Sequence, residues 1–122
     1  MSNSTPSKVT LAEKFATFTD VWSPRIISRY AGHEIRIARA EGEFPWHSHD
    51  DNDELFLVIE GELCIDFRDG TERLNAGELL VVPKGVEHRT RTEHGEAKVL
   101  IIDPKGTPNT GDEATAFKPV EV

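Results

Sequence analysis

From about residue 25 onward, apolar and polar residues alternate in short segments, and this period of two limits the fold more than any other feature of the sequence. Successive side chains of an extended strand point to opposite faces, so alternation gives a strand one buried and one exposed face. Turn-forming Gly, Pro and Asp residues separate the segments. The pattern predicts strands over residues 25–30, 33–40, 45–49, 54–60, 62–68, 71–74, 78–82, 86–92 and 96–103. Many short, evenly spaced strands are typical of an antiparallel sandwich or barrel, so we expect an all-β fold.

The sequence before residue 25 has a different character. Residues 1–9 are rich in Ser, Asn, Thr and Pro, which predicts a mobile tail. The stretch Thr10-Leu11-Ala12-Glu13 has the Ser/Thr-x-x-Glu pattern of a capping box, so a short N-terminal helix is expected to begin there. Leu11, Phe15 and Phe18 are spaced by four and three residues and would form one apolar stripe on that helix. We expect the stripe to pack against the β-region.

These patterns divide the chain into three parts. Residues 1–24 are expected to form a tail and a short helix, and residues 25–103 a β-barrel domain. Residues 104–122 are rich in turn-forming Gly, Pro and Asn, which interrupt strand pairing, so they are expected to form an arm or tail.

The composition fits one compact domain and argues against several classes of partner. The chain has 122 residues, of which 37% are apolar, and this is enough for a single core without disulfides. Its 14 Lys and Arg against 22 Asp and Glu give a formal net charge of −8, which disfavours binding to nucleic acids and anionic membranes. The lone cysteine, Cys64, excludes an intrachain disulfide and is expected to pack in the core. No signal peptide or membrane span is evident in the sequence, so we expect the cytoplasm.

Three of the five histidines occupy positions suited to metal binding. His47 and His49 lie two residues apart on a predicted strand, so both imidazoles should project from one face. Glu54 opens the next strand, and His88 follows a Pro-x-Gly turn later in the chain. A His-x-His pair by itself is more often an exposed polar pair. Three imidazoles and one carboxylate that meet inside a barrel would instead fit a divalent transition metal with open coordination positions.

Two stretches around these residues resemble the two motifs of the cupin superfamily. Residues 42–61, GEFPWHSHDDNDELFLVIEG, resemble the first motif, and residues 77–88, GELLVVPKGVEH, resemble the second. The resemblance covers about residues 30–103 and implies a small single-domain cupin, similar to the short mannose-6-phosphate-isomerase-like cupins. It implies a double-stranded β-helix, the cupin jelly-roll barrel. In that family both motifs supply metal ligands, and by resemblance these roles fall on His47, His49, Glu54 and His88.

The sequence departs from the cupin motifs at two places. Four residues, rather than the usual five, separate Gly42 from His47, which should alter the approach loop more than the ligand set. Thr92 stands where the second motif usually ends in Asn, and its hydroxyl can still form a hydrogen bond, although it need not replace that Asn.

The surroundings of the predicted ligands are acidic. Residues 40–67 contain many acids and no Lys or Arg. Most of these acids are expected in solvated loops, although their field would favour a bound cation. If Glu54 points away from the site, Asp53 is the fallback ligand, because a one-residue shift reverses the face. His33 and His94 lie outside the motifs and are expected at the surface.

Alternation along residues 54–60 predicts what shares the barrel interior. If Glu54 faces inward, Phe56 and Val58 do so too, and the Leu and Ile residues between them face outward. A strand that is apolar on both faces needs cover on the outside, from the N-terminal helix or from a second subunit. We expect a homodimer, as is common among cupins.

Three further residues are candidates for contact with a small-molecule ligand. Arg39 is in phase with Ile35 and Ile37, and it could hold an anionic group near the metal. Trp46 adjoins the first predicted ligand and either lines the mouth of the cavity or packs in the core. Phe56 shares its face of the strand with the predicted glutamate ligand.

The predicted donor set also narrows the chemistry. Three neutral imidazoles and one carboxylate around a divalent ion leave a net charge of about +1, which favours ligands with oxygen donors. We therefore expect a metal-binding cupin that acts on or binds a small oxygen-rich metabolite, such as a sugar, a keto acid or a hydroxy acid. Sugar isomerisation and Fe(II) dioxygenase chemistry are enzymatic alternatives, and a non-enzymatic metal-binding, ligand-binding or sensor protein is another. Mn, Fe, Co, Ni, Cu and Zn all accept such donors, and no catalytic base is assigned.

Overall fold

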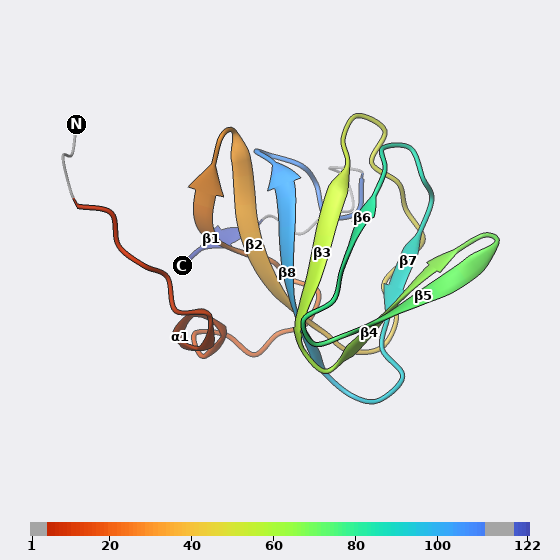
Figure 1. The fold of residues 1–122 in the computed structure, drawn as a ribbon, viewed down its shortest axis with the longest axis horizontal. Coiled ribbons are helices and arrows are strands. Elements are labelled where there is room, and N and C mark those ends of the chain that lie inside the picture. The colour runs from red at the N-terminus through yellow and green to blue at the C-terminus, as the bar shows by residue number, and fades with distance from the viewer. Residues whose placement is uncertain (1–4, 112–118) are drawn as a thin grey trace.

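A computed structural model describes residues 5–111 and 119–122 of the chain, and two sheets dominate it, antiparallel throughout except for one parallel pair (Figure 1). The large sheet has the strand order β6-β3-β8-β2-β1-β9, and the small sheet has the order β5-β4-β7. Its strands are β1 (Arg25–Tyr30), β2 (His33–Ala40), β3 (Glu54–Glu60), β4 (Glu62–Phe67), β5 (Gly70–Asn75), β6 (Leu79–Val82), β7 (Arg89–Arg91), β8 (Ala97–Pro104) and β9 (Val120–Glu121). The all-β, jelly-roll prediction is confirmed.

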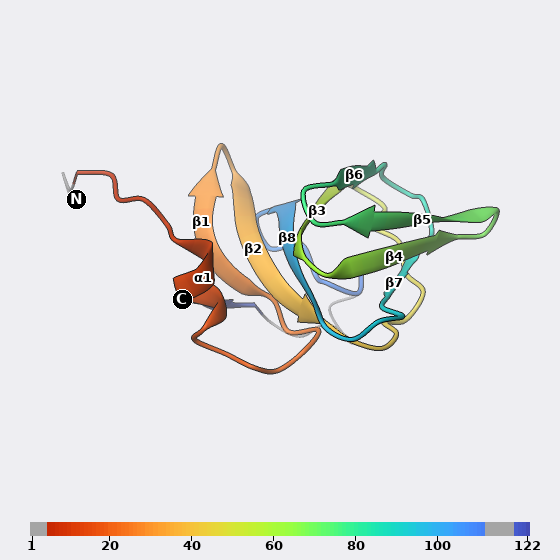
Figure 2. The same ribbon diagram turned by 60° about the horizontal axis from the view of Figure 1, so that its bottom comes forward.

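The two sheets face each other and enclose the main core. Figure 2 shows β4, β5 and β7 beside the end of the large sheet that contains β3 and β6. The apolar side chains between the sheets include Ala40, Phe56, Val58, Leu63, Ile65, Leu74, Val82, Ala97 and Val99. In β3 the buried residues are Glu54, Phe56 and Val58, and the residues between them are only partly buried. The predicted facing of this strand is therefore confirmed.

One predicted strand is not formed. Residues 45–49 belong to the irregular connection between β2 and β3, and their only strand-like pairing in the described chain is an isolated bridge between His47 and His88. Pro45 has no backbone N–H to contribute to a ladder, which limits the pairing at this point. The predicted strand over residues 86–92 is correspondingly reduced to the short strand β7.

The N-terminal helix is shorter than its apolar stripe. Helix α1 (Leu11–Phe15) follows Thr10, whose side chain makes no capping hydrogen bond, so the expected capping box is absent. Phe18 lies beyond the helix but is still buried, with its ring centroid 6.0 Å from that of Phe15. Both rings pack with Ile27 and Ile37 against the outer face of β1 and β2. Figure 2 shows α1 on that side of the sheet, so the expected outer cover exists over part of the face.

A glycine is required at the turn between β3 and β4. Gly61 has a φ of +83°, and a Cβ atom there would lie 2.8 Å from the backbone oxygen of Glu96. Any larger residue would combine backbone strain with a steric clash. This turn directs β4 into the small sheet, so Gly61 helps to set the two sheets opposite each other.

Parts of the expected terminal tails lie outside the described residues, namely residues 1–4 and 112–118. Within the described part of the chain, no helix is long and apolar enough to cross a membrane.

Candidate metal centre

Four predicted donors from three parts of the chain meet at one end of the space between the sheets. His47 and His49 come from the connection between β2 and β3, Glu54 is the first residue of β3, and His88 directly precedes β7. Each offers one ligand atom, and these four atoms all lie within 4.8 Å of one another. Glu54, His49 and His88 are buried and His47 is half-buried. We refer to these four residues as the His/Glu group.

The carboxylate of Glu54 lies beside two of the histidines of the His/Glu group. Its Oε1 atom is 3.2 Å from Nε2 of His49 and 3.5 Å from Nε2 of His88. The ring centroids of His47 and His88 are 4.4 Å apart. The donors therefore surround a common point rather than forming separate pairs.

Backbone hydrogen bonds fix the two histidine-bearing segments together. The N–H of His47 donates to the carbonyl of His88, and the N–H of His88 donates to the carbonyl of His47, each over 2.9 Å. The N–H of Gly85 donates to the carbonyl of His49 over 2.8 Å. The first and second motifs are thus joined at the site even though about 40 residues of a jelly roll separate them along the chain.

Neighbouring carbonyls set the orientation of two imidazole rings. Nδ1 of His47 lies 2.9 Å from the oxygen of Pro45, and Nδ1 of His88 lies 2.9 Å from the oxygen of Val86. A carbonyl can only accept, so Nδ1 carries the proton in both rings and Nε2 keeps its lone pair. Nε2 of His88, like Nε2 of His49, is buried without a hydrogen-bond partner among the residues that the structure describes. These lone pairs are available to a ligand inside the His/Glu group.

The protonation states also suit a metal ion. Burial lowers the pKa of His47 to about 4, and the nearby imidazoles contribute to this shift, so the ring is neutral at pH 7. Burial alone would raise the pKa of Glu54, but the adjacent imidazoles of His49 and His88 outweigh this effect and hold the pKa below its usual range. Neutral imidazoles and an ionised carboxylate are the forms that coordinate metals. Three nitrogen donors and one oxygen donor with open positions fit a divalent transition metal.

Comparison with known proteins agrees with this arrangement. The model of the family described as "Cupin domain" matches residues 33–103. The chain belongs to the cupin family. The resemblance of its two motifs to those of cupins is thereby confirmed.

Two similar proteins match most of this chain. The uncharacterized protein YdbB of Bacillus subtilis is 44% identical over 101 residues, which cover 75% of this chain and 83% of that protein. The crystal structure of a cupin-2 domain containing protein from Shewanella frigidimarina has a TM-score of 0.78 and 44% identity, and the match covers 80% of this chain and 94% of that one.

A third relative matches a smaller part of this chain. Acireductone dioxygenase of Leishmania braziliensis is 36% identical over 77 residues, which cover 58% of this chain and only 22% of that protein.

A cavity adjoins the His/Glu group between the sheets of the cupin. Glu54 and His47 contribute to its wall, and so does Phe56, whose ring centroid is 6.1 Å from that of His88. The rest of the wall is largely apolar and includes Ala38, Ala40, Leu63, Val99 and Ile101. Phe56 therefore lies where a ligand-contacting residue was expected.

Segments from both ends of the chain close part of this cavity. Trp22, before β1, and Asn109, after β8, both line it. The backbone after β8 passes so close to the His/Glu group that a Cβ atom on Gly111 would lie 2.0 Å from the oxygen of Ser48. Ser48 stands between two of the predicted ligands, so the described part of the C-terminal arm packs directly on the site.

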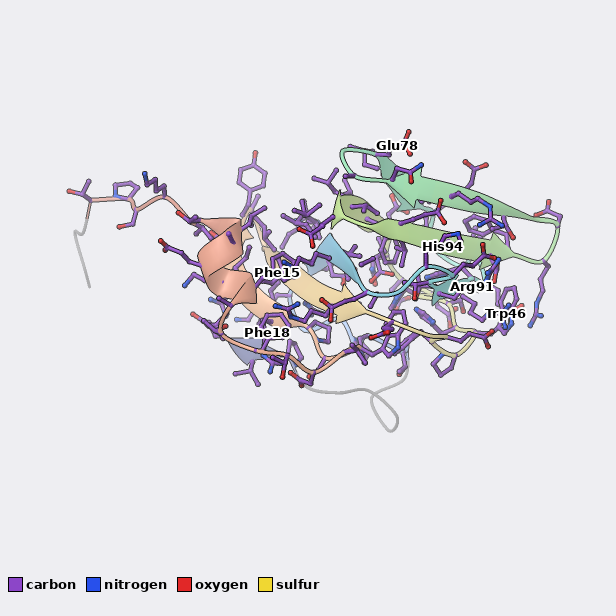
Figure 3. The ribbon with its side chains drawn as sticks, turned by 90° about the horizontal axis from the view of Figure 1, so that it is seen from below. Phe15, Phe18, Trp46, Glu78, Arg91 and His94 are labelled. Atoms are coloured by element: carbon purple, nitrogen blue, oxygen red, sulfur yellow. The ribbon has the colours of Figure 1, made fainter. Side chains whose placement is uncertain are left out.

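Arg39 and Trp46 lie elsewhere, and neither lines the cavity. Arg39 points to the outer face, where its guanidinium donates to the carbonyls of Phe15 and Phe18 over 2.7 and 3.0 Å. Its expected role at an anionic ligand is not supported by this position, because β2 presents its other face to the cavity. The ring of Trp46 lies under the guanidinium of Arg68, 3.8 Å from the ring centroid. Figure 3 shows Trp46 at the opposite end of the molecule from Phe15 and Phe18.

The remaining predicted residues have clear positions. Asp53 is exposed and its Oδ1 accepts a hydrogen bond from the N–H of Lys84, so it is separate from the inward-facing Glu54. The hydroxyl of Thr92 accepts a hydrogen bond from the N–H of Gly42 over 3.0 Å, which ties the start of the first motif to the end of the second.

The other cysteine and histidine predictions agree with the structure. Cys64 is fully buried, and His33 and His94 are exposed.

Three buried charged residues near the site were not predicted. Glu34, Arg36 and Asp103 lie on the inner face of β2 and β8, and two of them line the cavity. No signal in the sequence pointed to them. Glu34 and Arg36 are in phase with Ala38 and Ala40, whereas the large apolar residues Ile35 and Ile37 lie on the other face of β2.

Proposed function

We propose that this cupin binds a divalent transition metal through His47, His49, Glu54 and His88. The observation that carries the proposal is the pair of buried Nε2 atoms, on His49 and His88, beside the carboxylate of Glu54. Neither atom has a hydrogen-bond partner in residues 5–111 and 119–122. Buried polar atoms without partners are rare because leaving them unpaired is costly. A metal ion between the donors would supply the missing partner.

We further propose that the bound ion serves to bind, or to act on, a small oxygen-rich metabolite such as a sugar, a keto acid or a hydroxy acid. When bound, a divalent ion supplies Lewis-acid polarisation of a carbonyl or hydroxyl oxygen. The chain supplies the rest. Its ligands hold the site at a net charge of about +1, which favours oxygen donors, and Phe56, Leu63 and Val99 give an apolar wall that limits access of water.

A second candidate is dioxygen chemistry at Fe(II). It is favoured by the similarity to acireductone dioxygenase of Leishmania braziliensis, although this chain corresponds to only 22% of that protein. Imidazole and carboxylate donors with open positions are also the type of site that non-haem Fe(II) oxygenases use. If the metal-loaded cupin turns nothing over, the remaining alternative is a metal-binding, ligand-binding or sensor protein.

Metal analysis tests the proposed site directly. The protein is stripped with a chelator, loaded separately with Mn²⁺, Zn²⁺ and, without oxygen, Fe²⁺, and its metal content is measured by mass spectrometry. We expect about one ion per chain in the wild type and loss of that ion in His49→Ala. His33→Ala is the matched control, because His33 is exposed and outside the site. Unchanged stoichiometry in His49→Ala would contradict the proposal.

Turnover then separates the candidates. The metal-loaded protein is offered sugar phosphates, keto acids and hydroxy acids, and oxygen consumption is followed for the Fe²⁺ form. Oxygen uptake that depends on substrate favours the dioxygenase. Full metal occupancy without turnover of any compound favours the non-enzymatic alternative.

We also propose that the cupin is a homodimer. The outer face of the large sheet carries a continuous apolar surface that α1 covers only in part, formed by Leu55, Leu57, Leu79, Val81, Leu100 and Ile102. Leu79 is 60% exposed and Val81 is 47% exposed. An exposed apolar face of this kind is typical of a subunit interface, and a second copy of the chain is the proposed partner.

The proposed location is the cytoplasm, and nucleic acids and membranes are not proposed as partners. The single cysteine and the formal net charge of −8 support these assignments.

A further inference from the structure

A row of acidic side chains crosses the inner face of the large sheet beside the proposed metal site. Glu34 on β2 is paired in register with Asp103 on β8. On the other side of β8, Leu55 is paired with Ile102, which places Glu54 opposite Asp103. Directly opposed residues of an antiparallel pair point to the same face. The row therefore leads from the proposed metal ligand Glu54 across Asp103 to Glu34.

The guanidinium of Arg36 lies at the far end of this row and is almost completely buried. Its Nε and Nη2 atoms donate to Oε1 of Glu34 over 3.2 and 2.6 Å. Its Nη1 atom is 3.5 Å from Oδ2 of Asp103 but makes no hydrogen bond. One edge of the guanidinium is thus paired with Glu34 and the other edge is not.

Two polar atoms at this end of the cavity lack partners. In the described part of the chain, Nη1 of Arg36 and Oδ1 of Asp103 are both buried without a hydrogen bond, and both residues line the cavity that also contains Glu54 and His47. Buried donors and acceptors are almost always paired, with protein, water or ligand. Within residues 5–111 and 119–122 the chain supplies no partner for these two atoms, and a group bound in the cavity would supply one.

We propose that Arg36 and Asp103 bind a hydroxyl group of the ligand whose other oxygen atoms coordinate the metal. This inference rests on the proposed function of the metal site. A hydroxyl can accept a hydrogen bond from Nη1 of Arg36 and donate one to Oδ1 of Asp103, so one group satisfies both atoms. A carboxylate fits less well here, because it has no proton to donate to Oδ1 of Asp103.

The spacing of the sheet sets the size of the ligand. Glu54 and Asp103 lie on adjacent strands, which are about 5 Å apart, and Arg36 approaches Asp103 from the next strand. A chain of roughly three or four carbon atoms bridges such a distance. The apolar side chains of Phe56 and Ile101 line the cavity between the two polar ends and would contact its carbon atoms. The inferred ligand is a short polyhydroxy acid or a similar polyol derivative.

A series of hydroxy acids tests the inference on the wild-type protein. Glycolate, glycerate and erythronate all carry a 2-hydroxy carboxylate that can chelate the metal, and the two longer acids add hydroxyl groups along the chain. Their affinities for the Zn²⁺-loaded protein are measured by isothermal titration calorimetry. We expect glycerate or erythronate to bind about tenfold more tightly than glycolate, since a hydrogen bond to a charged group is being gained.

Arg36→Lys removes the free guanidinium edge while keeping a positive charge beside Glu34. In this variant the advantage of the longer acids should disappear while glycolate affinity changes less than about twofold. Arg25→Lys is the matched control, because Arg25 is a largely buried arginine that pairs with Asp20 outside the cavity. Asp103→Asn, which keeps the shape of the side chain, provides a second variant if Arg36→Lys does not fold.

The outcomes distinguish the two proposals. If all three acids bind with equal affinity, or if Arg36→Lys keeps the preference, the hydroxyl site is overturned while metal-dependent binding stands. If no acid binds and the metal itself is not retained, the proposed function fails first. If the metal is retained but no acid binds, the ligand class is wrong and the hydroxyl site with it.

Discussion

Burial decides how individual side chains in the site respond to pH. The pKa of His47 is lowered to about 4, mainly by burial, whereas an exposed histidine in the unfolded chain titrates near 6.5. A histidine with a depressed pKa keeps its proton off in the folded state, so folding is penalised once the unfolded chain takes up that proton. The contribution of His47 to the free energy of unfolding is therefore intact above about pH 7 and is lost progressively as the pH falls toward 4.

Replacement by a residue that does not titrate isolates this contribution. Other buried groups titrate too, and the pKa of Asp103, which burial and the neighbouring carboxylate of Glu54 raise to about 10, gives a pH dependence of opposite sign. We therefore expect His47→Gln to gain stability relative to the wild type on acidification, by about 2 kcal/mol between pH 7.5 and pH 5. Urea unfolding of the metal-free wild type and His47→Gln at the two pH values measures this difference in the free energy of unfolding. A difference that stays constant with pH would show that His47 is not buried as described.

Most strand positions could be predicted from the alternation of apolar and polar residues, because each strand of a jelly roll has one face toward the core. β3 shows this well, since its acid and its alternate apolar residues could be placed on the inner face from the sequence alone. β2 shows the limit of the method. Ile35 and Ile37 suggested an inner face, yet they face outward, because α1 and Phe18 cover that side of the sheet. Alternation cannot say which face a remote segment will cover.

The connection between β2 and β3 shows a second limit. Its histidine spacing indicated two imidazoles on one face of a strand, and the rings do meet, but the segment is not a strand. Pairing of His47 with His88 is set by the second motif, which lies far along the chain. The four donors could be named from motif spacing, whereas Arg36 and Asp103 could not, because their proximity to Glu54 depends on strand order.

Arg39 on β2 holds the helix segment through its hydrogen bonds, and a substitution tests this structural role. Arg39→Met would leave the carbonyls of Phe15 and Phe18 without their donor, so we expect a loss of about 1–3 kcal/mol in the free energy of unfolding. Metal and hydroxy-acid affinities should remain within about twofold of the wild type.

Arg29→Met is the control for this substitution, because Arg29 is exposed on β1 and pairs with Glu121 at the surface. Arg29→Met should lower the free energy of unfolding by less than about 0.5 kcal/mol. Unchanged stability of Arg39→Met together with weaker hydroxy-acid binding would restore Arg39 as a ligand-binding residue.

The molecule as a whole combines an enclosed polar site with an exposed apolar sheet face. The proposed dimer follows from that face and is independent of the metal. Leu79→Lys combined with Val81→Lys places two charges on the edge strand β6, so it should prevent association and leave a species of 13.6 kDa. Multi-angle light scattering measures the mass, and we expect about twice that value for the wild type.

A charge change elsewhere controls for non-specific effects on association. Asp69→Lys alters the exposed tip of the β4–β5 hairpin, away from the apolar face, and should leave the dimer intact. A wild-type mass of 13.6 kDa at the concentrations used would refute the dimer without affecting the metal site.

The central claim is that three imidazoles and one carboxylate, brought together by two sheets and a connecting loop, hold one metal ion. Anomalous diffraction from crystals of the Zn²⁺-loaded protein, collected on both sides of the zinc absorption edge, tests it most directly. The claim predicts one strong peak at coordination distance, about 2.0–2.2 Å, from His47, His49, Glu54 and His88. No peak at that point, or a peak only at the cluster formed by the half-buried Glu62 and the exposed Glu93 and His94, would contradict it.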